Sequence, residues 1–116
     1  MRHHAVNRKF GREKKVRAAL LRSLASNLIL MGRIETTEAK AKETRPYLER
    51  LITKERSGAL AAHRTVVAEL GKNAARELKN TILPKLGSRT SGFMRITRMG
   101  TRKSDASDMA RLSFVD

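Results

Sequence analysis

The chain is 116 residues long and carries 26 Lys and Arg against 11 Asp and Glu, which gives a formal net charge of +15 at pH 7. It has no cysteine, which excludes disulfides, thiolate metal sites and thiol nucleophiles, and no stretch approaches the roughly 18 to 20 consecutive apolar residues of a membrane helix. Because so large an excess of one charge is self-repulsive, it favours a polyanionic partner. We expect nucleic acid first and an anionic membrane surface second.

The chain opens with a basic segment that lacks helical periodicity. Residues 1–22 hold eight Lys and Arg against one acid. The planar guanidinium group suits phosphate, and the segment offers several, among them Arg2, Arg8 and Arg12. We predict that residues 1–12 are a basic extension that contacts nucleic acid and that residues 13–116 are a single folded domain. The alternative is a solvated tail that only aids solubility.

A helix is predicted from residue 14 to residue 31. Apolar side chains recur along one broad face at the helical period, namely Val16, Leu20, Leu21, Leu24, Leu28 and Met31. The opposite face carries small and basic residues that would let a phosphate backbone approach closely: Lys15, Ala18, Ala19, Arg22 and Ser26. Gly32 is a suitable C-cap, because glycine readily adopts the left-handed conformation that ends many helices.

A short strand and a second helix follow. The segment GRIETT alternates β-branched and polar side chains and predicts a strand. Thr37 is a suitable N-cap for a helix over residues 38–56. In that helix Glu38 complements the dipole and pairs with Lys42 one turn on. Pro46 predicts a kink or a restart of the helix, since an internal proline costs a helix roughly 3 kcal/mol. The residues expected in the core are Ala41, Leu48, Leu51 and Ile52.

Two more helices are predicted before the chain turns to strands. Residues 59–70 have apolar positions at Leu60, Val67 and Leu70 and are closed by Gly71. Asn73 is expected to cap the next helix, which ends at Pro84 and Gly87. Its inward-facing residues are Ala74, Ala75, Leu78 and Ile82.

The last quarter of the chain predicts a β-hairpin. Residues 93–99 and 109–115 alternate apolar and polar side chains and are expected to pair antiparallel across the polar turn GTRKSDASD. Phe93 and Phe114 are expected in the core. The order is therefore helix, strand, three helices, two strands, which predicts an α+β fold with helices on one face of a small mixed or antiparallel sheet.

A second basic block lies in this region. Between residues 88 and 103 there are five basic residues and no acid: Arg89, Arg95, Arg98, Arg102 and Lys103. A solvated sheet face is the alternative interpretation. We predict that this block contacts nucleic acid, and that loop and hairpin are adjacent, so that both basic blocks contact neighbouring phosphates.

Catalysis and metal binding have no candidate site. His3 and His4 have no third ligand nearby, and His63 is a lone histidine that we place at the surface or boundary of a helix. Asp105 and Asp108 are interpreted as turn-forming residues. No Gly-rich phosphate loop or nucleophile elbow is present, and aromatic residues are too few for base-stacking platforms. We expect no enzymatic activity, metal or cofactor.

Several phrases of the chain resemble one family. These are the opening MRH, RAALLRSLASNLIL, GRIETTEAKAKETRPYLERLIT, SGFMRI and the closing MARLSFVD, which are similar, in this order, to the L-seventeen family of the bacterial large ribosomal subunit. The resemblance implies a cytoplasmic, structural protein of α/β two-layer fold that binds large-subunit rRNA near the exit side of the polypeptide tunnel, beside other large-subunit proteins. It implies no enzymatic activity, no membrane and no small-molecule substrate.

Candidate RNA contacts come from two sources. The resemblance implies Arg2, His3, Arg8, Lys9, Arg12, Lys40, Lys42, Arg95 and Arg102. Charge and spacing add Lys15, Arg22, Arg89, Arg98 and Lys103. The chain departs from the family at His4, at Ser113 and in the turn from Arg102 to Asp105, which lacks a glycine. If that turn needs a positive φ, Ser104 is strained or the loop takes another shape.

Three other functions are compatible with the charge. A DNA-compacting protein would bind duplex DNA at least as well as structured RNA. A nuclease would require Asp105, Asp108 or a histidine for metal-dependent cleavage. A membrane-active peptide would bind anionic vesicles through its first helix, although the leucines of that helix are better explained as core.

Overall fold

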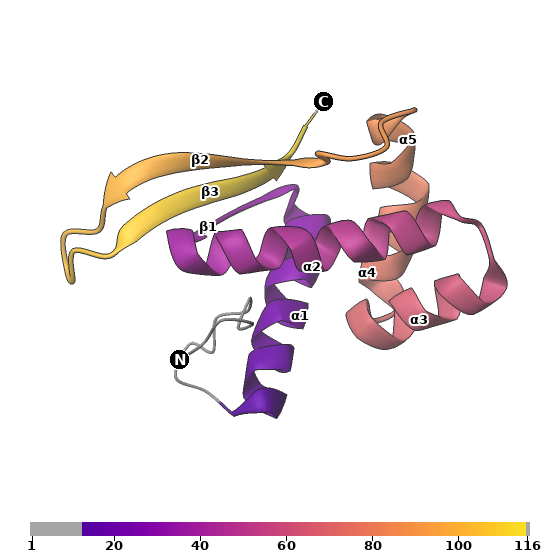
Figure 1. Ribbon diagram of the computed structural model, residues 1–116, viewed down its shortest axis with the longest axis horizontal. Coiled ribbons are helices and arrows are strands. Elements are labelled where there is room, and N and C mark those ends of the chain that lie inside the picture. The colour runs from indigo at the N-terminus through magenta and orange to yellow at the C-terminus, as the bar shows by residue number, and fades with distance from the viewer. Residues whose placement is uncertain (1–12, 116) are drawn as a thin grey trace, which may run out of the picture.

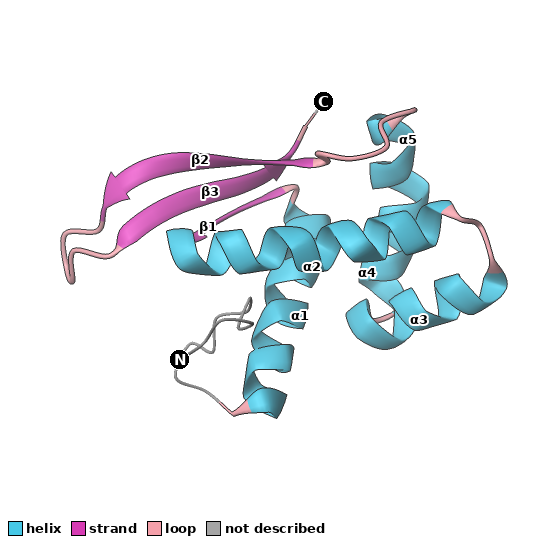
Figure 2. Ribbon diagram, in the orientation of Figure 1, coloured by secondary structure: helices cyan, strands magenta, loops and turns pink. Residues whose placement is uncertain are grey.

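Helices cover one face of a three-stranded antiparallel sheet (Figure 1), which confirms the predicted α+β, two-layer fold. The computed structural model describes residues 13–115. The elements, drawn by type in Figure 2, are α1 (Lys14–Met31), β1 (Arg33–Thr37), α2 (Glu38–Arg56), α3 (Leu60–Leu70), α4 (Lys72–Glu77), the π-helical segment η1 (Leu78–Ile82), α5 (Leu83–Leu86), β2 (Met94–Thr101) and β3 (Asp108–Phe114). Because α4, η1 and α5 form one unbroken run, the predicted order of elements is confirmed.

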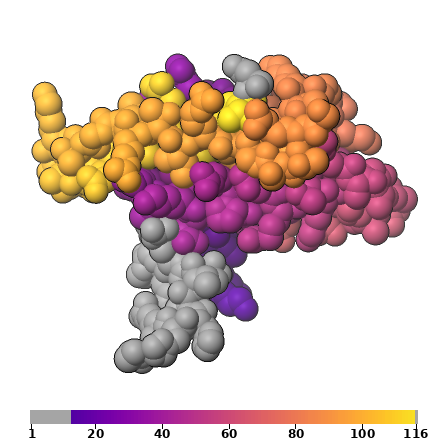
Figure 3. Space-filling model, turned by 45° about the horizontal axis from the view of Figure 1, so that its top comes forward, coloured from indigo at the N-terminus to yellow at the C-terminus, as the bar shows by residue number. Residues whose placement is uncertain are grey.

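Strand β3 occupies the centre of the sheet, in the order β1-β3-β2, and runs antiparallel to both neighbours. The predicted pairing of the last two strands is therefore confirmed, whereas the pairing of β1 with β3 was not predicted. Ile34 lies opposite Leu112, and such inward residues pack on α2. Figure 3 shows the hairpin of β2 and β3 as a layer above α2 that extends past the start of that helix. A bulge between Arg98 and Gly100 shifts the register near this end.

Helix α2 joins the two layers. Thr37 caps it as predicted, because its Oγ1 accepts a hydrogen bond from the Lys40 N–H at 3.4 Å. The four predicted core residues of this helix are all buried. The predicted restart at Pro46 does not occur, since α2 continues through it. Pro46 leaves the carbonyl of Lys42 without its helical donor, but both residues are exposed, so water can hydrogen-bond that carbonyl.

Only the C-terminal half of α1 enters the core. Its buried residues are Ala25, Leu28 and Ile29, whereas Val16 is 50% and Met31 76% exposed. The predicted apolar face is therefore wrong at both ends. At Val16 the reason is that the N-terminal end of α1 projects beyond the other helices (Figure 1). Ser26 was assigned to the outer face, but it is half-buried and donates a hydrogen bond to the Leu70 carbonyl at 3.2 Å.

The caps of the later helices differ in part from the prediction. Gly32 and Gly71 both have a positive φ and close α1 and α3, as expected. Asn73 is not a cap, because Gly71 holds the N-cap position and α4 begins at Lys72. Pro84 does not stop the helical run, which continues to Leu86. Leu60 is exposed, since it begins α3 at the edge of the molecule.

A single apolar core joins the layers. Phe93 is buried as predicted, and Phe114 is partly buried against the core. Within residues 13–115, no helix is both long and apolar enough to cross a membrane.

Candidate nucleic-acid interface

The basic residues of the sequence analysis lie in several places. Five of them fall outside the described residues: Arg2, His3, Arg8, Lys9 and Arg12. Lys15 and Arg22 lie on α1, Lys40 and Lys42 on the first turns of α2, and Arg95 and Arg98 on β2. Arg102 and Lys103 lie in the turn between β2 and β3, and Arg89 lies in the loop before β2.

A hollow of about 350 Å³ lies between the start of α2 and strand β2. Its charged lining residues are Glu38, Lys42, Arg45 and Arg98. Lys42 Nζ lies 2.9 Å and Arg98 Nε 3.5 Å from Glu38 Oε1. The Arg98 side chain is 79% exposed, so most of its guanidinium group remains accessible to an anion. Three cations against one carboxylate leave the hollow with an excess of positive charge.

The turn between β2 and β3 is organised by an ion pair. Arg102 donates two hydrogen bonds to Asp105, from Nε to Oδ1 at 2.9 Å and from Nη2 to Oδ2 at 2.7 Å. These bonds, with one from the Ser107 N–H, hold the pKa of Asp105 well below its usual range. The positive φ of 59° falls at Ala106 and not at Ser104, so the loop takes another shape from the one in which Ser104 would be strained. Asp105 is turn-forming, as predicted, whereas Asp108 begins strand β3.

The outer face of the sheet, turned away from the helices, carries arginines from all three strands. The register places Arg33 and Arg95 on either side of Ser113. Arg111 lies opposite Glu35 and donates to its Oε1 at 3.0 Å. Arg33 and Arg111 were not predicted as interface residues. Alternation in GRIETT turns Arg33 outward, but only the pairing of β1 with β3 aligns it with Arg95.

The second basic block does not form one surface. Arg89 and Arg102 lie at opposite ends of β2, a strand of eight residues that spans about 26 Å at ~3.3 Å per residue. Loop and hairpin are therefore not adjacent, so the predicted adjacency is wrong, and contact of each with phosphate stays a prediction. Arg95 faces the outer side of the sheet, whereas Arg98 borders the hollow beside α2. A run of charges along a strand divides between its two faces.

The two predicted residues of α1 have different surroundings. Lys15 is exposed near the projecting end of the helix, whereas Arg22 is half-buried. Tyr47 donates a hydrogen bond from its hydroxyl to Glu69 Oε2 at 2.6 Å. Burial, and then Glu69, raise the pKa of Tyr47 well above its usual range, while the charge of Arg22 opposes that shift. The charge of Arg22 therefore interacts with Tyr47 inside the protein as well as facing the solvent.

The histidine and aspartate candidates do not converge. Within residues 13–115, no group of three or more His, Asp or Glu side chains is placed to hold a metal ion. His63 is 33% exposed, in agreement with the predicted boundary position, and its Nδ1 lies 2.7 Å from Oε1 of the buried Glu55.

Comparison with known proteins identifies relatives along the whole chain. A family model described as "Ribosomal protein L17" matches residues 20–115. The chain is similar to the large ribosomal subunit protein bL17 of Gemmatimonas aurantiaca, with 47% identity over 99% of this chain and 98% of the relative. It is also similar to the bL17 proteins of Campylobacter jejuni, with 48% identity over 99% of both chains, and of Nautilia profundicola, with 46% identity over 99% of this chain and 98% of the relative.

Proposed function

Because the chain belongs to the ribosomal protein L17 family, we propose that it binds large-subunit rRNA through the phosphate backbone. As a member of this family it is a structural, non-enzymatic constituent of the large ribosomal subunit, a cytoplasmic particle, and it takes part in translation. We place it near the exit side of the polypeptide tunnel, where it stabilises rRNA packing and adjoins other large-subunit proteins. That position rests on the family resemblance alone.

The observation that carries phosphate binding is the excess of exposed cations around the hollow between α2 and β2. Lys42 and Arg98 approach it from two elements that are far apart in sequence. Their shared partner Glu38 is only 17% exposed, so it holds the two cations in place without presenting much negative surface. A phosphate that contacts this hollow meets positive charges that are already positioned, which lowers the entropy cost of binding.

We infer that the chain recognises RNA by its shape and backbone charge, and not by base-specific contacts. A-form RNA hides its base edges in a deep, narrow major groove, so proteins recognise its helices mainly through phosphates and 2′-hydroxyls. Each phosphate that is neutralised releases counterions, and this release drives binding. The basic extension of residues 1–12 is proposed to add such contacts, and Arg33 and Arg45 join the predicted set.

A salt titration tests the proposal. We expect K42Q/R98Q to bind large-subunit rRNA more weakly than the natural chain, with the slope of log affinity against log salt reduced by about 0.7 to 0.9 for each phosphate that the variant no longer neutralises. The control K54Q/K85Q removes the same charge from exposed positions outside the hollow and should keep the slope. Equal slopes for all three proteins would contradict a role for this hollow.

A second experiment tests the extension and the kind of nucleic acid. Removal of residues 1–12 should weaken rRNA binding and reduce the salt slope, whereas a solubility tail would leave both unchanged. Duplex DNA, titrated under the same conditions, should bind more weakly than the rRNA. The full chain should also sediment with large subunits through a moderate-salt gradient, and its absence from them would refute the ribosomal assignment.

A further inference from the structure

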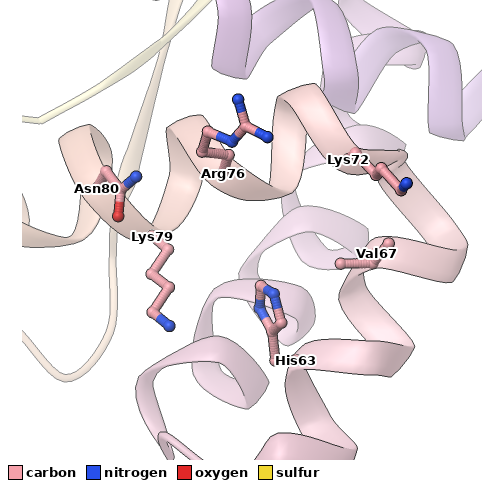
Figure 4. A pocket seen from close by; sticks show the side chains of 6 residues that line it. All are labelled: His63, Val67, Lys72, Arg76, Lys79 and Asn80. Atoms are coloured by element: carbon pink, nitrogen blue, oxygen red, sulfur yellow. The ribbon is translucent and has the colours of Figure 1, made fainter.

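A second hollow lies between α3 and the start of the α4–η1 run (Figure 4), away from the residues assigned above. Its volume is about 290 Å³, and its lining residues are His63, Val67, Lys72, Arg76, Lys79 and Asn80. Three of them are cationic, and none is a carboxylate. The hollow beside α2, in contrast, contains Glu38.

The cations of this second hollow are not neutralised by ion pairs among the described residues. Within the described part of the chain, Lys72, Arg76 and Lys79 form no ion pair with a carboxylate, whereas Arg98 and Arg102 each have one. Like charges held around one cavity repel one another, and an anion in the cavity relieves that repulsion.

Local structure brings these cations to the same hollow. Lys72 and Arg76 are one turn apart on α4, whereas Lys79 and Asn80 lie in the π-helical segment. Pro84 accounts for that segment: it has no N–H to donate to the Asn80 carbonyl, and in a regular α-helix its ring would clash with that carbonyl. In the wider turn the Leu83 N–H donates to the Leu78 carbonyl, five residues earlier, and not to the carbonyl four residues earlier as in an α-helix. Such π turns often occur at functional sites.

The opposite wall is held by a buried contact. Figure 4 shows His63 on α3 facing the α4–η1 run, with Lys79 extending from that run on the side of His63 and the Arg76 guanidinium group pointing away from His63. His63 Nδ1 lies 2.7 Å from Glu55 Oε1, and the Glu55 side chain is only 2% exposed. Glu55 thus fixes the imidazole ring from behind and is not itself among the lining residues. No carboxylate is therefore among the residues that line the hollow.

We propose that this hollow is a separate phosphate-binding site that takes one phosphodiester group of the RNA backbone. Lys72, Arg76 and Lys79 are exposed, so their side chains turn toward the phosphate and provide charge-assisted donors to its oxygens. The Asn80 amide adds a neutral donor. The proposal rests on the function proposed above. It extends the RNA contact from the end of the sheet to the helical side of the molecule.

The test compares four full-length proteins in binding to large-subunit rRNA between 50 and 200 mM salt. K72Q/R76Q/K79Q should neutralise one phosphate fewer than the natural chain, which reduces the slope by about 0.7 to 0.9 and makes the fall in affinity across this range about threefold smaller. The control K54Q/R64Q/K85Q removes three exposed charges outside the hollow and should keep the slope. K72R/R76K/K79R preserves the charges and should also keep it.

The outcomes separate this site from the general function. If the natural chain shows no salt-dependent binding to rRNA, both proposals fail. If the natural chain binds but K72Q/R76Q/K79Q has the slope of its control, only the second hollow is refuted. A reduced slope in the charge-preserving variant would also refute it, because a site that acts through charge accepts either Lys or Arg. Circular dichroism of each variant checks that a reduced slope does not reflect unfolding.

Discussion

The contact between Glu55 and His63 makes a sharp prediction about stability. The Glu55 side chain is 2% exposed, and its Oε1 lies 2.7 Å from His63 Nδ1. The second oxygen, Oε2, is buried without a hydrogen-bond partner in the described part of the chain. Replacing His63 with Leu therefore leaves a buried carboxyl group with no side-chain partner at all. Such a group carries its full desolvation cost.

The size of the effect follows from how deeply the pair is buried. Removing one partner of a fully buried ion pair costs about 3 to 5 kcal/mol. Since the His63 side chain is one third exposed, water can reach the vacated space, and we expect a destabilisation of about 2 to 3 kcal/mol for His63→Leu. Replacing both residues with apolar ones removes the stranded group, so E55M/H63L should be more stable than H63L alone by about 1 to 2 kcal/mol.

Urea unfolding at pH 7 measures both quantities. The midpoint and slope of the transition, followed by circular dichroism, give the free energy of unfolding of the natural chain, both single variants and the double variant. The same urea slope in all four would show that the folded and unfolded states remain comparable. A destabilisation below about 0.5 kcal/mol for H63L, or a double variant no more stable than H63L, would falsify the view that His63 compensates the buried carboxyl group.

Three further predictions concern other local contacts. Thr37→Ala removes the side-chain cap of α2 and should lower the free energy of unfolding by about 1 kcal/mol, measured by urea titration, whereas Thr37→Ser should retain most of it. Arg102 lowers the pKa of Asp105 from its ordinary 3.8, so the ion pair stabilises the turn at neutral pH and this stabilisation is lost as the pH falls below about 4. ¹H–¹⁵N NMR should detect disorder in the turn under acid, and Asp105→Asn should show the same disorder already at pH 7. Because the pKa of Tyr47 is raised above its ordinary 10, the free energy of unfolding should fall as the pH rises above about 10. In urea unfolding, Tyr47→Phe should make this fall smaller. At pH 7 the same variant should lose about 1 kcal/mol, because Glu69 is left without its hydrogen-bond donor.

Part of the fold could be predicted because it depends on neighbours in sequence. The N-cap at Thr37 and the C-cap at Gly32 need only residues within one helical turn. The core face of α2 follows from the helical period. Asn73 was misassigned because Gly71, two residues earlier, satisfies the same boundary.

The candidate site was predicted less well than the fold. Lys42 and Arg98 were both expected to contact RNA, but the sequence does not place them beside one hollow. Arg33 and the proposed Lys72, Arg76 and Lys79 cluster were not among the residues predicted from the sequence. The sequence signal for these residues is only that basic side chains recur at helical or strand spacing. A face that is merely exposed to solvent has the same pattern.

Composition and local spacing alone predicted a polyanionic partner and the α+β order of elements that the structure has. Net charge and periodicity are properties of the chain before it folds. Tertiary structure decided which part of α1 is buried, that β1 pairs with β3, and that the second basic block divides among separate surfaces. Each of these depends on contacts between residues far apart in sequence, and periodicity does not encode what packs against a given face.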